Sequence, residues 1–204
     1  MPEKKQKFYA VRKGRTTGIL MTWKECQAAT THYPGAEFKS FPTREEAEAF
    51  LNRTYVLGVD TPETDSPVLD IYVDGSYHIR RHIYGWGVVI LNGDPPETLC
   101  GSGDEADYLM ARNVAGEVFA SLHAMQWAVE HGYSSIRIFY DYEGICKWAT
   151  GDWKTNTPIS IMYANTVREN YSQKLHVTFE KVEAHTGVRY NELADQVAKS
   201  AVGM

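Results

Sequence analysis

Apolar and polar residues alternate along VLDIYVDGSYH, residues 68–78, which is the pattern of a β-strand with one buried face. Leu69, Ile71 and Val73 would point into the core, and the strand is expected to end at Asp74. A glycine and a serine follow this aspartate at once. A carboxylate in that position is either a turn residue or a ligand of a metal ion, and other parts of the chain are needed to distinguish the two.

After this strand, the spacing of apolar residues predicts further strands and helices along the rest of the chain. Val118, Leu122, Met125 and Val129 recur at helical spacing, and a glycine stands where that helix would stop. The order of elements, β-β-β-α-β-α-α-β-α, predicts an α/β fold in which helices flank a mixed, five-stranded sheet. The remaining strands are expected at 84–92, near 97–102, over SSIRIFYD and over KLHVTFEKVEAH, and the remaining helices over EGICKWATG, TPISIMYANTVRENYS and NELADQVAKSAV.

The residues ahead of this pattern predict a separate small α+β unit with three strands and two helices. The strands are expected over KFYAVRKG, TGILMTW and AEFKSF. Thr22 would cap the first helix, and Thr43 with Glu46 three residues later forms a capping box for the second. A unit of about fifty residues buries little apolar surface, so it should be only marginally stable alone.

A linker is expected between the two patterns. The stretch TYVLGVDTPETDSP contains two prolines and several acidic residues, with little periodicity. The chain should therefore consist of a small domain over 1–53, a linker over 54–67 and a larger domain over 68–204.

Composition narrows the class of protein. Hydrophobic residues make up 43% of the 204 residues, and no apolar run approaches the roughly 20 residues that cross a bilayer. The N-terminus lacks the apolar stretch of a signal peptide, and the three cysteines form no CxxC pair, which argues against a structural zinc site. These features lead us to expect a cytoplasmic protein.

Charge is distributed unevenly along the chain. Residues 1–53 carry ten Lys and Arg against six Glu, a net +4, whereas residues 54–204 carry eleven against twenty acidic residues, a net −9. This asymmetry suggests different tasks for the two parts of the chain.

Four acidic residues would converge at one edge of the predicted sheet. Asp74 and Asp141 end strands, whereas Glu117 and Asp195 lie in the first turns of helices. Each alone has an ordinary explanation, as a turn residue, a partner of the helix dipole or part of a solvated helix face. Together they would repel one another strongly unless a divalent cation is bound, and ligation by oxygen alone favours Mg²⁺ or Mn²⁺ over zinc.

Four motifs around these acids resemble the catalytic blocks of type 1 ribonuclease H, in order and with suitable spacing. They are YVDGS, RNVAGEV, FYDYEGI and VEAHTGVRYNELADQVAK, and the resemblance covers residues 68–201. The last motif is the most specific, with a histidine, a short loop and then Asn-Glu-Leu-Ala-Asp. The stretch from FYAVRKG to REEAEAF resembles the hybrid-binding domain that precedes many type 1 ribonucleases H. A ribonuclease H-like domain behind a hybrid-binding domain is therefore implied.

This resemblance implies an endonuclease that hydrolyses the RNA strand of RNA/DNA hybrids and leaves 5′-phosphate and 3′-hydroxyl ends. Asp74, Glu117, Asp141 and Asp195 would hold two Mg²⁺ ions, with Asp74 bridging both, and Mn²⁺ should substitute. One ion would activate the attacking water and the other would stabilise the leaving oxygen. His185 matches the family's mobile-loop histidine, which assists water activation or product release; the alternative is an ordinary surface histidine.

The resemblance also implies contacts to nucleic acid. Asn113 stands where the family uses an amide side chain to touch RNA 2′-hydroxyls. Tyr9, Trp23, Phe38 and Lys39 match the duplex-contacting positions of the hybrid-binding domain, although the aromatic residues could instead form the core of a small domain. The expected partner is an RNA/DNA hybrid, with double-stranded RNA as a further ligand of the N-terminal domain, and the protein is expected to be a monomer.

The sequence departs from the family pattern at several contact positions. RNVAGE keeps one asparagine where many members have Asn-Asn-Arg, and Tyr-Glu rather than Ser-Gln follows Asp141. Ser40 stands where relatives often carry a second lysine, and TGDWKTNTP offers only Lys154 in place of a basic, Trp-rich protrusion. The larger, acidic domain therefore has no obvious cluster of cationic residues with which to bind nucleic acid.

Two other functions are consistent with parts of this pattern. Another nuclease of the same superfamily, such as an integrase or transposase, would use three acids and would need domains that bind DNA ends. A non-catalytic protein that binds hybrids or double-stranded RNA would gain from losing the repulsion among four acids. A nuclease assay with and without Mg²⁺ distinguishes the three.

Overall fold

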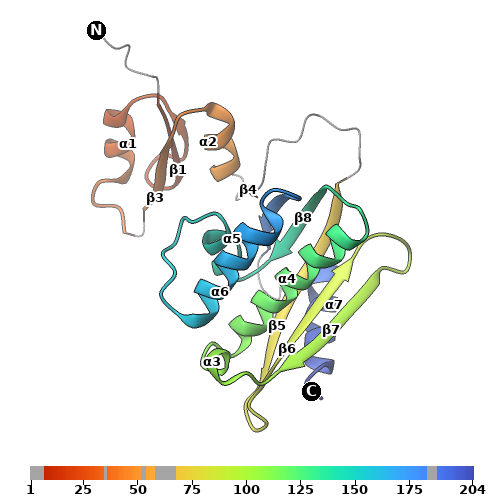
Figure 1. Ribbon diagram of the computed structural model, residues 1–204. Coiled ribbons are helices and arrows are strands. Elements are labelled where there is room, and N and C mark those ends of the chain that lie inside the picture. Colours follow the sequence, from red (N-terminus) through yellow and green to blue (C-terminus); the bar gives the residue numbers. More distant parts are fainter. Residues whose placement is uncertain (1–6, 35, 52–53, 58–67, 183–187) are drawn as a thin grey trace. The chain divides into compact units, whose positions relative to one another are not determined.

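The computed structural model describes residues 7–34, 36–51, 54–57, 68–182 and 188–204 (Figure 1). The chain forms two compact units, 1–55 and 56–204. Residues 54–57, at the start of the predicted linker, form strand β4 (Thr54–Leu57), and the rest of that linker lies outside the described ranges. No helix within those ranges is both long and apolar enough to span a membrane.

The N-terminal unit is a three-stranded antiparallel sheet with two helices, as the sequence predicts. Its strands lie in the order β2-β1-β3. The Thr22 hydroxyl accepts a hydrogen bond from the Glu25 N–H, and the Glu25 carboxylate accepts one from the Thr22 N–H, so the first helix begins with a capping box. The elements are β1 (Phe8–Lys13), β2 (Gly18–Leu20), α1 (Trp23–Thr30), β3 (Glu37–Phe41) and α2 (Arg44–Leu51).

Both faces of this small sheet are covered. Ala10 of β1 packs with Ala47 and Phe50 of α2. Its neighbour Val11 packs with Cys26 of α1. Because successive strand residues point to opposite faces, one helix lies on each side of the sheet.

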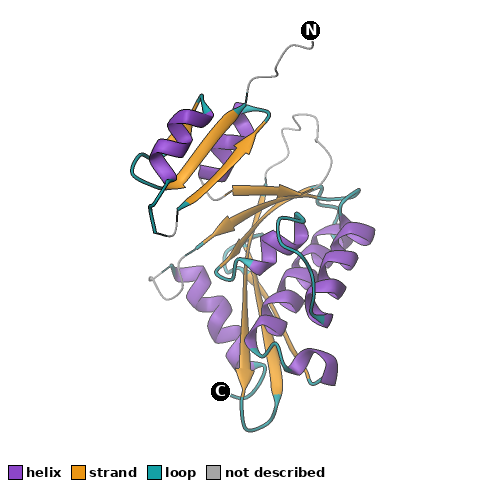
Figure 2. Ribbon diagram, turned by 90° about the vertical axis from the view of Figure 1, so that its left-hand side faces the viewer, coloured by secondary structure: helices purple, strands orange, loops and turns teal. Residues whose placement is uncertain are grey.

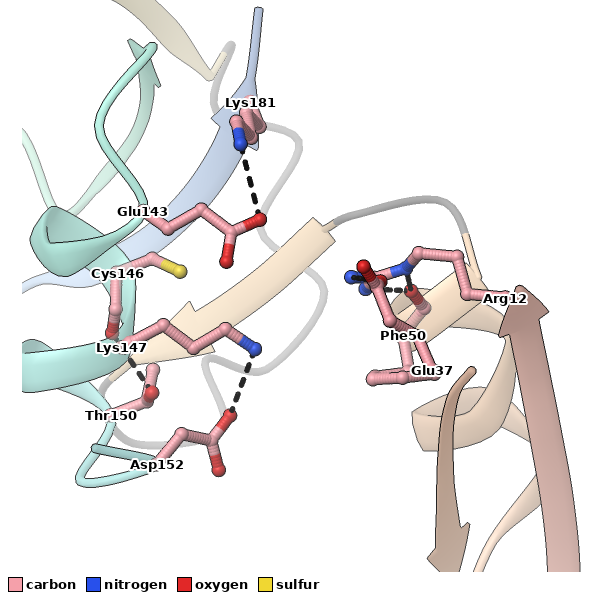
Figure 3. Close-up of polar contacts among 9 residues, drawn as sticks. All are labelled: Arg12, Glu37, Phe50, Glu143, Cys146, Lys147, Thr150, Asp152 and Lys181. Atoms are coloured by element: carbon pink, nitrogen blue, oxygen red, sulfur yellow. Dashed lines mark hydrogen bonds and ion pairs between the residues drawn. The ribbon is translucent and has the colours of Figure 1, made fainter. Parts of the chain in front are cut away.

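Arg12 links three elements of the N-terminal unit. A bulge between Val11 and Lys13 takes Arg12 out of register with β3. Its guanidinium lies 4.1 Å from the centre of the Phe50 ring, donates to the Phe50 carbonyl and pairs with Glu37 at 3.3 Å (Figure 3). One charged side chain thus ties β1 to β3 and to the end of α2, in a unit with little apolar core.

The second unit is built on a mixed sheet with the strand order β4-β9-β8-β5-β6-β7. β5 pairs in parallel with β8, and β8 with β9, whereas β6 and β7 follow β5 as an antiparallel meander. This confirms the five-stranded sheet that the sequence predicts, with β4 added at one edge. The five strands are β5 (Leu69–His78), β6 (Ile83–Ile90), β7 (Glu97–Gly103), β8 (Ser135–Tyr140) and β9 (His176–Lys181).

Helices cover both faces of the larger sheet (Figures 1 and 2). On one face α4 (Asn113–Glu130) stacks Phe119 on Tyr84 of β6, with ring centroids 5.1 Å apart. On the other face lies α7 (Arg189–Ser200), whose Ala198 carbonyl accepts a 2.7 Å hydrogen bond from the Ser76 hydroxyl of β5. The helices on the α4 side are α3 (Ala106–Leu109), α5 (Gly144–Ala149) and α6 (Pro158–Thr166), which continues as a π-helical turn over Val167–Tyr171.

Two differences from the predicted boundaries change where acidic residues lie within their elements. β5 does not end at Asp74 but runs on to His78, because β6 continues to pair with it. α4 begins at Asn113, so Glu117 lies in its second turn rather than its first. The parallel pairing of β5 with β8 ends at Tyr72, so Asp74 does lie just beyond the parallel part of the sheet.

Candidate active site

Three of the four predicted acidic ligands lie together in the second unit. Asp74, Glu117 and Asp141 each place one carboxylate oxygen within 4.8 Å of the others. Asp74 lies in the middle of β5, Glu117 lies on α4, and Asp141 directly follows β8. Asp74 and Glu117 are only 7% and 2% exposed, whereas Asp141 is half-buried. We call these three residues the acidic cluster; it is accessible to solvent on the side of Asp141.

Two glycines allow α4 to approach β5 closely. A Cβ at Gly75 would lie 2.3 Å from the backbone nitrogen of Glu117, and one at Gly116 would lie 2.0 Å from the carbonyl oxygen of Gly85. No side chain fits at such distances without displacing the helix. These glycines directly adjoin Asp74 and Glu117 in the sequence, and they bring the two carboxylates side by side.

Burial and like charge change the acidity of the cluster. Burial, followed by the negative charge of Asp141, raises the pKa of Asp74 to about 7, although a 2.7 Å hydrogen bond from the Gly75 N–H acts in the opposite direction. Burial, followed by the charges of Asp74 and Asp141, also raises the pKa of Glu117 well above its ordinary value. Without a counter-ion the cluster therefore holds protons close to neutral pH.

The donor set fits a divalent cation. Glu117 Oε2 is buried and has no hydrogen-bond partner among the described residues, whereas buried carboxylate oxygens are normally paired. Three carboxylates form a ligand set of oxygens alone, which suits Mg²⁺ or Mn²⁺. A cation here would both relieve the repulsion and give Glu117 Oε2 a partner.

Asp195, the fourth predicted ligand, lies near the acidic cluster but is not part of it. Its charge contributes to the raised pKa of Asp74, after burial and Asp141, which places it within electrostatic range. Its Oδ2 accepts a 2.7 Å hydrogen bond from Lys199 Nζ, one turn further along α7. The structure thus holds the fourth carboxylate in an ion pair beside the other three.

Asn113 lies at the border of the acidic cluster. It is the exposed first residue of α4 and precedes Glu117 by one helical turn, so both lie on the same side of the helix. His185 belongs to residues 183–187, which the structure does not describe.

The predicted contacts of the N-terminal unit separate into two groups. The Trp23 ring lies between those of Tyr9 and Phe38, at centroid distances of 5.8 and 6.1 Å. Trp23 and Phe38 are 50% and 41% exposed and so are not core residues, whereas Tyr9 packs partly against the core under α1. Lys39 is exposed but lies on the opposite face of β3, because neighbouring strand residues alternate. Ser40, paired with Tyr9, shares the aromatic face.

Two residues near the acidic cluster were missed as site residues at the sequence level. Lys199 could have been found, because it follows Asp195 by four residues in a helix, the spacing of an ion pair. Tyr142 has a pKa raised first by burial and then by the charge of Glu117, so it lies within electrostatic range of the acids. No sequence pattern distinguishes Tyr142 from an ordinary loop residue.

Family models match the two units separately. The model described as RNase H matches residues 66–203, which is well over half of the chain. The model described as Ribonuclease H1 N-terminal domain matches residues 7–51.

Relatives also match one unit each. Ribonuclease H1 of Homo sapiens is 51% identical over 47 residues, and the match spans 23% of this chain and 16% of the human protein. Ribonuclease H of Agrobacterium fabrum (strain C58) is 29% identical over 140 residues, or 66% of this chain and 94% of that protein. The chain thus matches a small part of the human protein and nearly the whole of the bacterial one.

Solved structures share the fold of the second unit. RNase H1 from the halophilic archaeon Halobacterium salinarum NRC-1 has a TM-score of 0.52 at 22% identity, covering 67% of this chain and 98% of that one. LC11-RNase H1 in complex with an RNA/DNA hybrid has a TM-score of 0.51 at 18% identity, covering 66% and 99%. At these identities the likeness shows the fold alone. The two family models decide the relationship: the chain belongs to the RNase H family, with a Ribonuclease H1 N-terminal domain ahead of its RNase H domain.

Proposed function

We propose that the protein is a metal-dependent endoribonuclease that hydrolyses the RNA strand of RNA/DNA hybrids and leaves 5′-phosphate and 3′-hydroxyl ends. The observation that carries this proposal is the acidic cluster of Asp74, Glu117 and Asp141 within an RNase H domain. Burying like charges together lowers stability, and a protein that only binds nucleic acid gains nothing from that loss. A nuclease does gain, because the same carboxylates can hold cations at a phosphate.

Each acidic residue of the site would have a role in binding the metal ions. Asp74, Glu117 and Asp141 would hold the metal ions, and Asp195 would join them on leaving Lys199. Two Mg²⁺ ions, or Mn²⁺ in their place, would supply charge neutralisation at the phosphate and a more acidic water. Glu117 and Asp74 are fixed by the close contact of α4 and β5, which keeps the ligand positions rigid.

Contacts to the substrate would come from both units. Asn113 is suited to hydrogen-bond RNA 2′-hydroxyls, the group that distinguishes RNA from DNA. Trp23 and Phe38 present exposed rings against which sugars can pack, in a segment with a net charge of +4. Double-stranded RNA would be a further ligand of this unit. His185 would assist water activation or product release.

Cleavage of a labelled hybrid tests the proposal. The purified protein should cut the RNA strand in Mg²⁺, leave duplex DNA intact and lose all activity in EDTA. Cleavage that persists in excess EDTA would exclude a metal-dependent reaction. Binding without cleavage in Mg²⁺ and in Mn²⁺ would favour the non-catalytic alternative, and processing of DNA ends would favour an integrase-like or transposase-like enzyme.

Substitution of the acids tests the site itself. Asp74→Asn and Asp141→Asn should each lower the cleavage rate by orders of magnitude, because each removes a charged ligand from the cluster. Hybrid binding measured by fluorescence anisotropy should persist. Glu169→Gln, at an exposed carboxylate on the π-helical turn, is the control and should leave the rate unchanged. Near-normal rates for both aspartate variants would show that the site lies elsewhere.

A further inference from the structure

The turn between β5 and β6 places two adjacent arginines in a unit with a net negative charge. Residues 78–82 read His-Ile-Arg-Arg-His, whereas residues 54–204 together carry a net charge of −9. All four residues of the turn itself, Ile79–His82, are exposed. We call residues 78–82 the basic turn.

Several other cations of this unit are neutralised locally. Lys181 Nζ lies 3.1 Å from a Glu143 oxygen, and Lys147 Nζ lies 3.9 Å from an Asp152 oxygen (Figure 3). Among the described residues of this unit, Arg137, Arg168 and Lys199 are also paired with carboxylates. Arg80 makes no ion pair or hydrogen bond with any residue that the structure describes, so its charge is available to a partner.

Hydrogen bonds within the basic turn and to the end of the chain order its backbone. The Arg81 N–H donates to both the carbonyl oxygen and Nδ1 of His78, each at 3.2 Å. The Tyr77 hydroxyl and His82 Nδ1 share a hydrogen bond of 3.2 Å, and His82 adopts a left-handed φ of 51°. Arg81 Nη1 donates to the Val202 carbonyl at 2.8 Å, which ties the turn to the end of α7 (Figures 1 and 2).

These contacts assign different roles to the two arginines. Arg81 donates a hydrogen bond to the Val202 carbonyl after α7, whereas the guanidinium of Arg80, at the tip of the turn, has no partner among the described residues. A guanidinium on a hydrogen-bonded turn is suited to bind phosphate, because its planar donors match two phosphate oxygens and the backbone of the turn has little conformational entropy left to lose.

The basic turn lies at the same end of the sheet as the acidic cluster. β5 passes Asp74 and continues four residues to His78, so at a rise of about 3.3 Å per residue the turn begins roughly 13 Å beyond Asp74. Asp141 follows the carboxyl end of β8, which runs parallel to β5. Since a duplex carries a phosphate charge about every 1.7 Å along its axis, one placed on the cluster presents further phosphates to the turn.

We propose that Arg80, presented by the basic turn, binds a backbone phosphate of the nucleic-acid substrate beside the acidic cluster. This inference rests on the proposed function and deepens it, because it gives the acidic unit an electrostatic contact of its own. Arg80 is a positioning residue: it holds the strand near the carboxylates but does not touch the reacting atoms.

Salt dependence of binding tests the inference in the full-length protein. The affinity for a labelled RNA/DNA hybrid is measured by fluorescence anisotropy at several salt concentrations, in EDTA so that no cleavage occurs. Arg80→Gln should lower the slope of log Kd against log salt by about 0.9, the loss of one phosphate contact. Arg80→Lys should restore most of that slope, because lysine brings back the positive charge, although it lacks the planar guanidinium that binds two phosphate oxygens.

Lys174→Gln is the matched control. Lys174 is an exposed cation just before β9, and β9, β8 and β5 are parallel, so it lies at the opposite end of the sheet from the basic turn. The control has the same net charge as Arg80→Gln and should keep the original slope. Equal slopes for Arg80→Gln and Lys174→Gln would overturn the inference, because only overall charge would then matter.

Steady-state cleavage in Mg²⁺ separates this inference from the proposed function. Arg80→Gln should raise KM by about three-fold or more at moderate salt and change kcat little. If the original chain cleaves hybrids but the slopes of the two glutamine variants are equal, only the assignment of Arg80 is wrong. If the original chain binds hybrids without cutting them, the proposed function fails, and the salt slopes still decide the role of Arg80.

Discussion

At the scale of single residues, the acidic cluster makes the stability of the metal-free protein depend on pH. Folding raises the pKa of Asp74 to about 7 and raises that of Glu117 as well, whereas in the unfolded chain such groups titrate near pH 4. Between these values the folded chain binds more protons than the unfolded chain. The stability that these groups contribute is therefore fully present below about pH 4 and is lost as the pH rises through the folded pKa values.

Asp74→Asn should remove part of this dependence. In EDTA at pH 8, we expect the variant to be more stable than the original chain by about 1–2 kcal/mol, or roughly 2–8 °C in Tm, because the asparagine carries no charge to bury. Below about pH 3 the difference should become small, since Asp74 is then largely protonated in both the folded and the unfolded chain. Thermal unfolding followed by circular dichroism measures both values.

The metal provides the control for this prediction. In saturating Mg²⁺ the order should reverse, because a cation that binds only the folded cluster stabilises the original chain more than the variant. Glu169→Gln, remote from the cluster, should show no such pattern. If Asp74→Asn were no more stable than the original chain at pH 8 in EDTA, the prediction would be wrong. The charge of Asp74 would then not destabilise the folded protein.

A second prediction at this scale concerns Ser40. Ser40 shares the aromatic face of the N-terminal sheet with Tyr9 and Phe38, whereas Lys39 points to the other face. Ser40→Lys should therefore place a cation beside the exposed rings, tighten hybrid binding about three-fold at moderate salt and steepen the salt slope by about 0.9. Glu37→Gln is the control, because it changes the net charge of the same strand by the same amount but lies on the opposite face of the sheet. If both variants bound equally well, total charge rather than position would explain the gain.

At the scale of elements, the distance between α4 and β5 sets the distance between Glu117 and Asp74. Gly116→Ala would place a Cβ 2.0 Å from the carbonyl oxygen of Gly85, so α4 has to move outward. We expect a loss of about 1–3 kcal/mol in the free energy of unfolding and weaker Mg²⁺ binding, measured by denaturant unfolding and by calorimetric titration. Gly93→Ala is the control, because its Cβ would meet nothing closer than 3.9 Å. Unchanged Mg²⁺ affinity in Gly116→Ala would mean that the helix does not set the ligand geometry.

Element types could be predicted from sequence because they depend on local chemistry. The alternation of Leu69, Ile71 and Val73 identified β5, and Thr22 with Glu25 fixes the start of α1. The end of β5 could not be predicted, because GSYH after Asp74 has no apolar alternation and continues the strand by pairing with β6. β4 was missed for a related reason, since four residues carry too little pattern to distinguish a strand from a linker.

The candidate site was predictable only in part. The positions of the four acids at strand ends and helix starts, and then the resemblance, pointed to all four, and the structure gathers three of them. No periodicity shows that α4 can touch β5 at two glycines. Nor does it show that Asp195 is held by Lys199. Such features depend on packing between segments far apart in the sequence, which local patterns do not encode.

At the scale of the whole molecule, the proposed function assigns substrate capture and chemistry to different parts of the chain. Residues 1–53 carry a net +4 and the exposed rings, whereas the acidic cluster lies in the unit with a net −9. Deleting residues 1–53 should therefore weaken hybrid binding and raise KM, and should change kcat much less. The truncated chain should begin at Thr54, so that β4 is kept in the larger sheet.

Steady-state kinetics at several salt concentrations measure this division. Trp23→Ala in the full-length chain should reproduce part of the rise in KM without the loss of charge. Equal KM values and equal salt slopes for the full-length and truncated proteins would show that the N-terminal unit is not the main anchor of the substrate.

The hydrogen bond from Arg81 to the Val202 carbonyl has a practical consequence for protein engineering. A version of the enzyme shortened after Ala201 would lose this acceptor, although it would keep every residue of the acidic cluster. The turn that carries Arg80 would then lose its tie to the end of α7. Shortened versions of the chain should therefore retain Val202.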